Sequence, residues 1–116
     1  MTPSHFVRLI SVADLPPGGG LPAQVGGRQI AVFNVDGTFY AVENECPHRG
    51  GSLVDGALLG TSVVCPLHRW QFSLLDGANV AGAGMGVSRY PVEVRNGGVW
   101  VDLRGTDVST SSDDAV

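Results

Sequence analysis

Two short segments of similar composition constrain this chain more than any other feature of its sequence. The first is CPH at residues 46–48 and the second is CPLH at residues 65–68, with sixteen residues between them. Cys46 and Cys65 are the only two cysteines, and a histidine follows each within three positions. In a reducing compartment such thiols stay unbridged, and nearby histidines indicate metal ligation. A fold that uses both segments must bring two separate loops together.

The residue types match a 2Fe–2S cluster with mixed ligands. In such a cluster two thiolates bind one iron and two histidines bind the other, so each segment would contribute to both irons. Zinc is the competing interpretation, because it also binds two cysteines with two histidines. Zinc sites usually space their first ligands as C-x₂₋₄-C, and the prolines after both cysteines have no role at zinc. Chance placement is the third interpretation, and the matched spacing argues against it.

Prolines and glycines shape both segments. Pro47 and Pro66 directly follow the cysteines, and because proline fixes φ and has no N–H, both loops are expected to be stiff beside the sulfur ligand. Gly50 and Gly51 allow tight turning where a Cβ would clash. The third histidine, His5, lies near the N-terminus and is not expected to be a ligand.

The rest of the chain alternates short apolar runs with turn residues. The clearest element is a hairpin, in which Asp36-Gly37 separates the β runs 29–35 and 38–43. Further strands are expected within the runs Phe6–Ile10, Ser62–Val64, Phe72–Leu75, Val87–Val94 and Val99–Leu103. Short strands between turns predict an all-β fold, either an antiparallel sandwich or a small barrel.

Two segments are expected to lack strands. Residues 11–20 predict a turn region with one helical turn capped by Ser11, in which the glycines 18–20 form a linker. Residues 104–116 are rich in Ser, Thr and Asp and predict a disordered tail. One domain of residues 1–103 would therefore precede a polar C-terminal tail.

Composition excludes several functions. The chain has 116 residues, a net charge of −4 and no lysine, so no basic surface for nucleic acid is expected. No apolar run approaches the roughly 20 residues that span a bilayer. Residues 1–8 lack the basic and apolar regions of a signal peptide. A cytoplasmic location without membrane attachment is therefore expected.

The strings CPHRGGSL and CPLHRWQF resemble the two cluster-binding segments of the Rieske family, and the likeness covers most of residues 6–103. The resemblance implies that Cys46 and Cys65 are thiolate ligands of one Rieske-type 2Fe–2S cluster. It implies that His48 and His68 are the imidazole ligands. It also implies an antiparallel β body of two or three sheets, with a two-loop cluster-binding subdomain at one exposed end.

Four positions depart from the pattern of the family members found in cytochrome complexes. Gly51 and Leu67 stand where those members have further cysteines joined by a disulfide, so that bridge is not expected. Trp70 and Phe72 stand where those members have a serine and a tyrosine that donate hydrogen bonds to sulfur. Fewer such bonds lower the reduction potential, which predicts a value of roughly −150 mV and little pH dependence near pH 7. Trp70 and Phe72 are expected to shield the cluster or to pack in the core.

The resemblance implies an electron carrier that passes single electrons from an NAD(P)H-dependent flavin reductase to a terminal redox enzyme or a large catalytic subunit. No independent substrate site is evident, and 116 residues leave no room for the mononuclear iron domain of a ring-hydroxylating oxygenase. Two assignments compete, the ferredoxin component of a ring-hydroxylating dioxygenase and the small subunit of an NAD(P)H nitrite reductase. The loop sequences slightly favour the nitrite reductase subunit. A non-catalytic zinc-stabilised β module is the alternative from another class.

Each predicted ligand histidine is followed by an arginine. Arg49 and Arg69 would make both loop tips basic in an otherwise acidic chain. Such arginines favour either a docking face for acidic partners or simple solvation of the surface.

Overall fold

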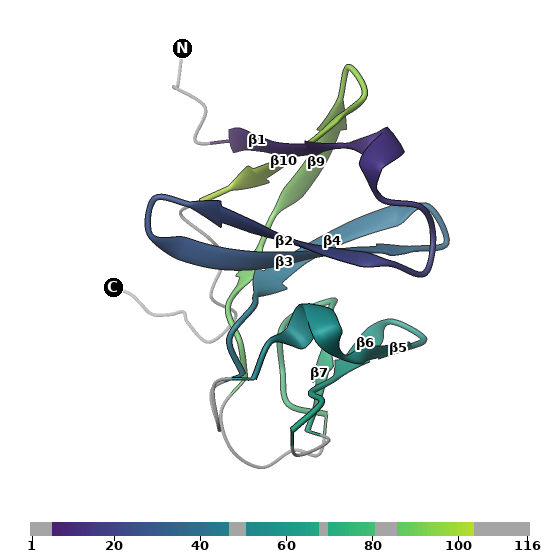
Figure 1. Ribbon diagram of the computed structural model, residues 1–116, viewed down its shortest axis with the longest axis vertical. Helices are drawn as coiled ribbons and strands as arrows, with labels where there is room; N and C mark the ends of the chain where they lie inside the picture. Colours follow the sequence, from purple (N-terminus) through teal and green to yellow (C-terminus); the bar gives the residue numbers. More distant parts are fainter. Residues whose placement is uncertain (1–5, 47–50, 68–69, 81–85, 104–116) are drawn as a thin grey trace.

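The computed structural model describes residues 6–46, 51–67, 70–80 and 86–103, and within these ranges it contains three antiparallel sheets (Figure 1). The first sheet has the order β1 (Phe6–Ser11), β10 (Gly98–Asp102), β9 (Val92–Arg95). The second has the order β2 (Gly20–Val25), β3 (Arg28–Val35), β4 (Thr38–Glu43), β8 (Arg89–Tyr90). The third has the order β5 (Ala57–Leu59), β6 (Ser62–Val64), β7 (Gln71–Ser73). The predicted all-β antiparallel class is confirmed.

The second sheet lies between the other two (Figure 1). The side chains in the middle of β3 fit this central position, because they are apolar on both faces of the strand. Successive side chains of a strand point to opposite faces, so Ile30 and Val32 enter one core while Ala31 and Phe33 enter the other. All four side chains are almost completely buried. A strand covered on both faces needs a continuous apolar run, which explains the sequence IAVF.

The two cores therefore have different roles. The base core lies between the first and second sheets and consists of Leu15, Ile30, Val32, Phe39, Ala41, Tyr90, Val99 and Val101. The loop-side core joins the second sheet to the third and consists of Ala31, Phe33, Val42, Cys46, Leu53, Val63, Cys65, Phe72, Leu74 and Val87. Both cysteines belong to the loop-side core.

The predicted hairpin is confirmed. Asp36 and Gly37 have φ angles of 52° and 93°, and two positive φ values are typical of the type I′ turns that match strand twist. Val35 pairs with Thr38 across the turn, and the Gly37 N–H donates to Asn34 Oδ1 at 2.8 Å. The turn thereby sets the register of the central strands.

The predicted helical turn is also confirmed. A 3₁₀ helix, η1 (Val12–Asp14), follows Ser11, whose N–H donates to Asp14 Oδ2 at 3.1 Å. A second 3₁₀ helix, η2 (Leu53–Asp55), lies beside the third sheet and was not expected from sequence. No helix in the described ranges is long and apolar enough to cross a membrane.

Three strand assignments from sequence were wrong. Gly20 begins β2 and is not part of a linker, and Pro22 is accommodated because β2 is an edge strand that pairs only with β3. The strand β5 was missed. The single strand expected over 87–94 is two strands in different sheets, β8 and β9, because Pro91 lies between them and cannot donate to a ladder. Residues 104–116 lie outside the described ranges, so the division into a domain and a tail stays a prediction.

Candidate metal centre

Cys46 and Cys65 are buried, with 1% and 0% of their surface exposed. Cys46 follows β4 after two intervening residues, and Cys65 follows β6 directly. Neither cysteine forms a disulfide. His48 and His68 lie outside the described residues, so the structure places the cysteine half of the predicted ligand set.

The two loops that begin at the cysteines are closed by the same hydrogen bond. The Cys46 N–H donates to the Gly51 carbonyl at 2.8 Å, and the Cys65 N–H donates to the Trp70 carbonyl at 2.7 Å. In each loop the acceptor lies five positions after the cysteine, and in sequence the predicted histidine lies between donor and acceptor. The matched spacing of the two segments therefore corresponds to a matched backbone closure at the base of each loop.

The two loops meet at Gly51. A Cβ placed on Gly51 would lie 2.9 Å from Leu67 Cγ, 3.0 Å from Leu67 Cδ1 and 3.3 Å from Cys65 Sγ. The first loop thus packs directly against the second loop and its thiol. Gly51 was expected to lie where a Cβ would clash, and the structure confirms this, since the space is taken by Leu67 and the Cys65 sulfur. Gly51 and Leu67, between which no disulfide was expected, instead make an apolar contact.

Asn44 anchors the first loop and was missed by sequence reasoning. Its side chain is 3% exposed. Its Oδ1 accepts from the Val54 N–H at 2.9 Å and its Nδ2 donates to Ser52 Oγ at 3.1 Å. Its carbonyl accepts from the Leu53 N–H at 2.7 Å, and its N–H donates to the Gln29 carbonyl at 2.9 Å. The side-chain amide of Asn44 therefore ties the start of the loop to Ser52 and η2, while its backbone N–H joins the same point to β3. The only signal in the sequence is the tendency of asparagine to bond nearby backbone at turns.

We expect Asn44→Ala to lower the free energy of unfolding by about 1–3 kcal/mol, because it leaves the Val54 N–H without its acceptor. Asn44→Asp retains an acceptor oxygen but buries a carboxylate, so its loss is expected to be smaller at acidic pH, where the carboxyl is protonated, than at neutral pH. Urea unfolding followed by circular dichroism measures both variants. Equal stability of Asn44→Ala and the wild type would contradict the anchoring role.

Gly56 positions the strand that leads into the second loop. A Cβ on Gly56 would lie 1.9 Å from the Val64 carbonyl oxygen and 3.2 Å from the Leu53 carbonyl oxygen. Val64 is the residue before Cys65. The close approach of η2 to β6 thus requires a residue without a side chain, and nothing in the sequence pattern indicates this.

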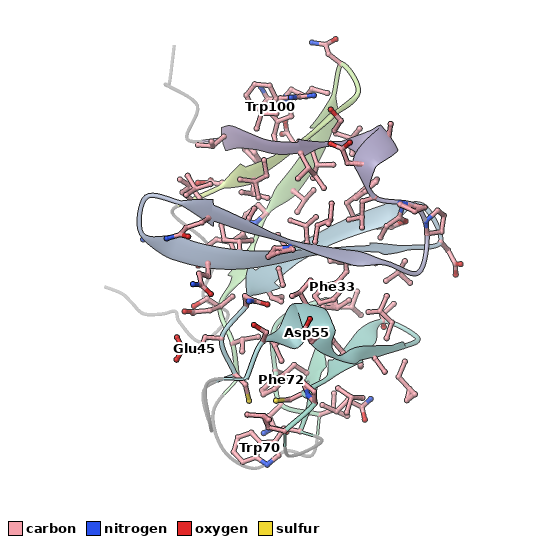
Figure 2. The ribbon with its side chains drawn as sticks, viewed as in Figure 1. Phe33, Glu45, Asp55, Trp70, Phe72 and Trp100 are labelled. Carbon is pink, nitrogen blue, oxygen red and sulfur yellow. The ribbon has the colours of Figure 1, made fainter. Side chains whose placement is uncertain are left out.

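Phe72 and Trp70 are the two aromatic residues at the loop-side core that lie nearest to the second cysteine in sequence. Phe72 is fully buried in that core, which confirms the packing role considered for it. Trp70 is half-buried and packs on it, with ring centroids 6.3 Å apart and an interplanar angle of 52°. Figure 2 places Trp70 at the opposite end of the molecule from Trp100. Shielding of a cluster by Trp70 stays a prediction.

The charged groups predicted for this site lie outside the described residues. No group of three or more His, Cys, Asp or Glu gathers among the described residues, and both predicted ligand histidines lie outside them. Arg49 and Arg69 also lie outside, so the proposed basic docking face stays a prediction.

Burial raises the pKa of Tyr90, and Glu43 raises it further. Tyr90 belongs to the base core and is not part of this centre.

Known proteins resemble this chain over most of its length. Residues 5–91 match the family model described as the Rieske [2Fe-2S] domain. The ferredoxin component of the naphthalene 1,2-dioxygenase system of Pseudomonas putida is 32% identical over 99 residues, which cover 84% of this chain and 95% of that protein.

Solved structures with the same fold include an oxygenase–ferredoxin complex and a nitrite reductase small subunit. One belongs to the complex of reduced oxygenase and oxidized ferredoxin in carbazole 1,9a-dioxygenase, with a TM-score of 0.75, 30% identity, and coverage of 86% of this chain and 94% of the matched chain. The other is assigned as the NADH-dependent nitrite reductase small subunit of Mycobacterium tuberculosis, with a TM-score of 0.77, 28% identity, and coverage of 83% and 92%.

Proposed function

Because this chain belongs to the Rieske [2Fe-2S] family, we propose that it carries single electrons between an NAD(P)H-linked reductase and a terminal redox enzyme. A Rieske-type 2Fe–2S cluster is the cofactor that the family implies, and it accepts and releases one electron at a time when bound. The observation that carries the proposal is that two loops with the same backbone closure each place a buried thiol in one shared core.

The proposed ligands are Cys46 and Cys65 at one iron and His48 and His68 at the other. The described residues fit this assignment, because both thiols are buried and Gly51 of the first loop lies against the Cys65 sulfur of the second. Two thiolates from adjacent loops suit one iron–sulfur centre. The family assignment favours iron and sulfide over the zinc-stabilised module considered above.

The decisive experiment is analysis of the purified protein. Two irons and two acid-labile sulfides per chain, with the EPR signal of a reduced Rieske centre, are the expected result. A colourless protein that contains zinc, after expression with adequate iron, would contradict the proposal.

A low reduction potential is expected from the surroundings of the sulfur ligands. Cys46 and Cys65 lie among apolar side chains such as Leu53 and Phe72, and an apolar environment disfavours the extra negative charge of the reduced state. Phe72 also brings no hydroxyl to this core. We expect a midpoint of roughly −150 mV that stays constant between about pH 6 and pH 8. Redox titration followed by EPR measures it, and a midpoint above zero would contradict this account.

We propose a ring-hydroxylating dioxygenase as the first candidate for the electron acceptor and a flavin reductase as the donor. The support is the similarity to the naphthalene dioxygenase ferredoxin component over nearly the full length of that protein. A related ferredoxin is known in complex with its oxygenase. The reduced chain should then be oxidised rapidly when mixed anaerobically with an oxygenase encoded near its own gene.

A nitrite reductase subunit is the second candidate. It is supported by the similar fold of the Mycobacterium tuberculosis protein and by the loop sequences CPHRGGSL and CPLHRWQF. Under this assignment the chain should co-purify with a large siroheme-containing subunit and should stimulate its NAD(P)H-dependent reduction of nitrite. A gene for a dioxygenase or for a nitrite reductase beside the gene of this chain would identify the partner to use in these assays.

A further inference from the structure

We propose that Leu67 is a latch, a side chain whose contact with Gly51 holds the loop at Cys65 against the loop at Cys46 and thereby slows loss of the cluster. The proposal rests on the assignment of the loops at Cys46 and Cys65 as ligand loops. It assigns a positioning role to a side chain that carries no ligand atom.

The geometry of Gly51 carries the inference. The Leu67 side chain and the Cys65 sulfur both occupy the side of Gly51 on which a side chain would project, at 2.9 Å and 3.3 Å from an ideal Cβ. Gly51 itself is buried, although Leu67 is 55% exposed. Leu67 therefore lies against Gly51 through Cγ and Cδ1, although more than half of the residue is exposed to solvent.

This contact differs in kind from the hydrogen bonds at the loop bases. The bond from Cys46 to Gly51 acts within the first loop, and the bond from Cys65 to Trp70 acts within the second. The contact of Leu67 with Gly51 joins one loop to the other. A centre whose ligands come from both loops is lost once the loops separate, so an inter-loop contact controls the rate of that opening.

Leu75 provides a matched control. It is also 55% exposed, and it lies in the turn after β7, outside both ligand loops. Loss of the visible absorbance of the cluster, followed anaerobically in excess chelator, measures opening. We expect Leu67→Ala to lose the cluster on the order of tenfold faster than the wild type, since it removes the Cγ and Cδ1 atoms that lie against Gly51. Leu75→Ala should match the wild type, and Leu67→Met should restore most of the lifetime.

A double-mutant cycle separates a latch from general destabilisation. Gly51→Ala adds a methyl group within 2.9 Å of Leu67 Cγ and should also shorten the lifetime of the cluster. Combined with Leu67→Ala, which frees that space, it should cost much less than the sum of the single effects, because the two residues are in contact. The midpoint of thermal unfolding should change little in Leu67→Ala.

Two results would overturn the latch. One is equal cluster lifetimes for Leu67→Ala and Leu75→Ala, and the other is full additivity of the Gly51→Ala and Leu67→Ala effects. Either result, obtained with a wild type that holds two irons, would leave the electron-carrier function intact. A wild type without a cluster would instead contradict the proposed function itself.

Discussion

A His68→Ala protein is expected to be isolated without a stable Rieske-type cluster, whereas a His5→Ala protein keeps it. The proposed ligand set uses His68 as one of two imidazoles on the same iron, and alanine offers no donor atom in its place. His5 is the one histidine outside the paired segments. The comparison therefore changes the same residue type at a ligand position and at a position with no proposed role.

Iron and sulfide content, together with the EPR spectrum of the reduced protein, measure the effect. We expect at least a tenfold lower cluster content for His68→Ala, in line with the steep dependence of metal sites on their ligands. His48→Ala, Cys46→Ser and Cys65→Ser should show the same loss. Retention of a normal Rieske signal in any of these four variants would remove that residue from the ligand set.

Gly56→Ala is expected to be strongly destabilising although it changes no ligand. The added Cβ would lie 1.9 Å from the Val64 carbonyl oxygen, so η2 or β6 must move. Gly56 has φ −84° and ψ 171°, an extended conformation that alanine adopts without strain. The expected loss of about 3 kcal/mol or more in the free energy of unfolding is therefore steric in origin. Because Cys65 directly follows Val64, cluster content should fall as well.

Gly60→Ala is the control for this prediction. Gly60 lies in the turn of the same small sheet, where it has φ +61° and no atom within 4 Å of an ideal Cβ. Alanine there meets only the backbone penalty of the left-handed region, about 1–2 kcal/mol. Denaturant unfolding of the two variants compares the cost of a steric clash at Gly56 with the cost of a left-handed backbone at Gly60. A smaller loss for Gly56→Ala than for Gly60→Ala would contradict the proposed close packing of η2 against β6.

The site illustrates which features a sequence can predict. Each cysteine has a histidine two or three positions later, and this repeated local pattern indicated two loops that each supply ligands to one centre. The structure brings the two cysteine loops together, as the pattern required. Asn44 and Gly56 carried no comparable signal. Their roles depend on partners in η2 and β6, and those contacts exist only after the chain has folded.

The fold likewise contains elements that local sequence predicts and elements that only tertiary pairing defines. The hairpin around Asp36-Gly37 was predictable because its turn geometry and its flanking β-branched residues are local properties. The strand β2 was not, because Pro22 weakens the local pattern and only pairing with β3 makes an edge strand of it. Similarly, the sequence around Pro91 alternates without a break, and the sheets alone assign β8 and β9 to different layers.

The sequence by itself predicted the β class and the central hairpin, since these follow from residue types at short spacing. Its two cysteine segments also carried the resemblance that implied the family and its cofactor. The tertiary structure alone decided that Gly51 lies under Leu67, that Gly56 lies against Val64, and that Asn44 joins the first loop to β3. The physical reason is that close packing and hydrogen bonding between segments distant along the chain depend on three-dimensional distances, which periodicity and turn propensity do not contain.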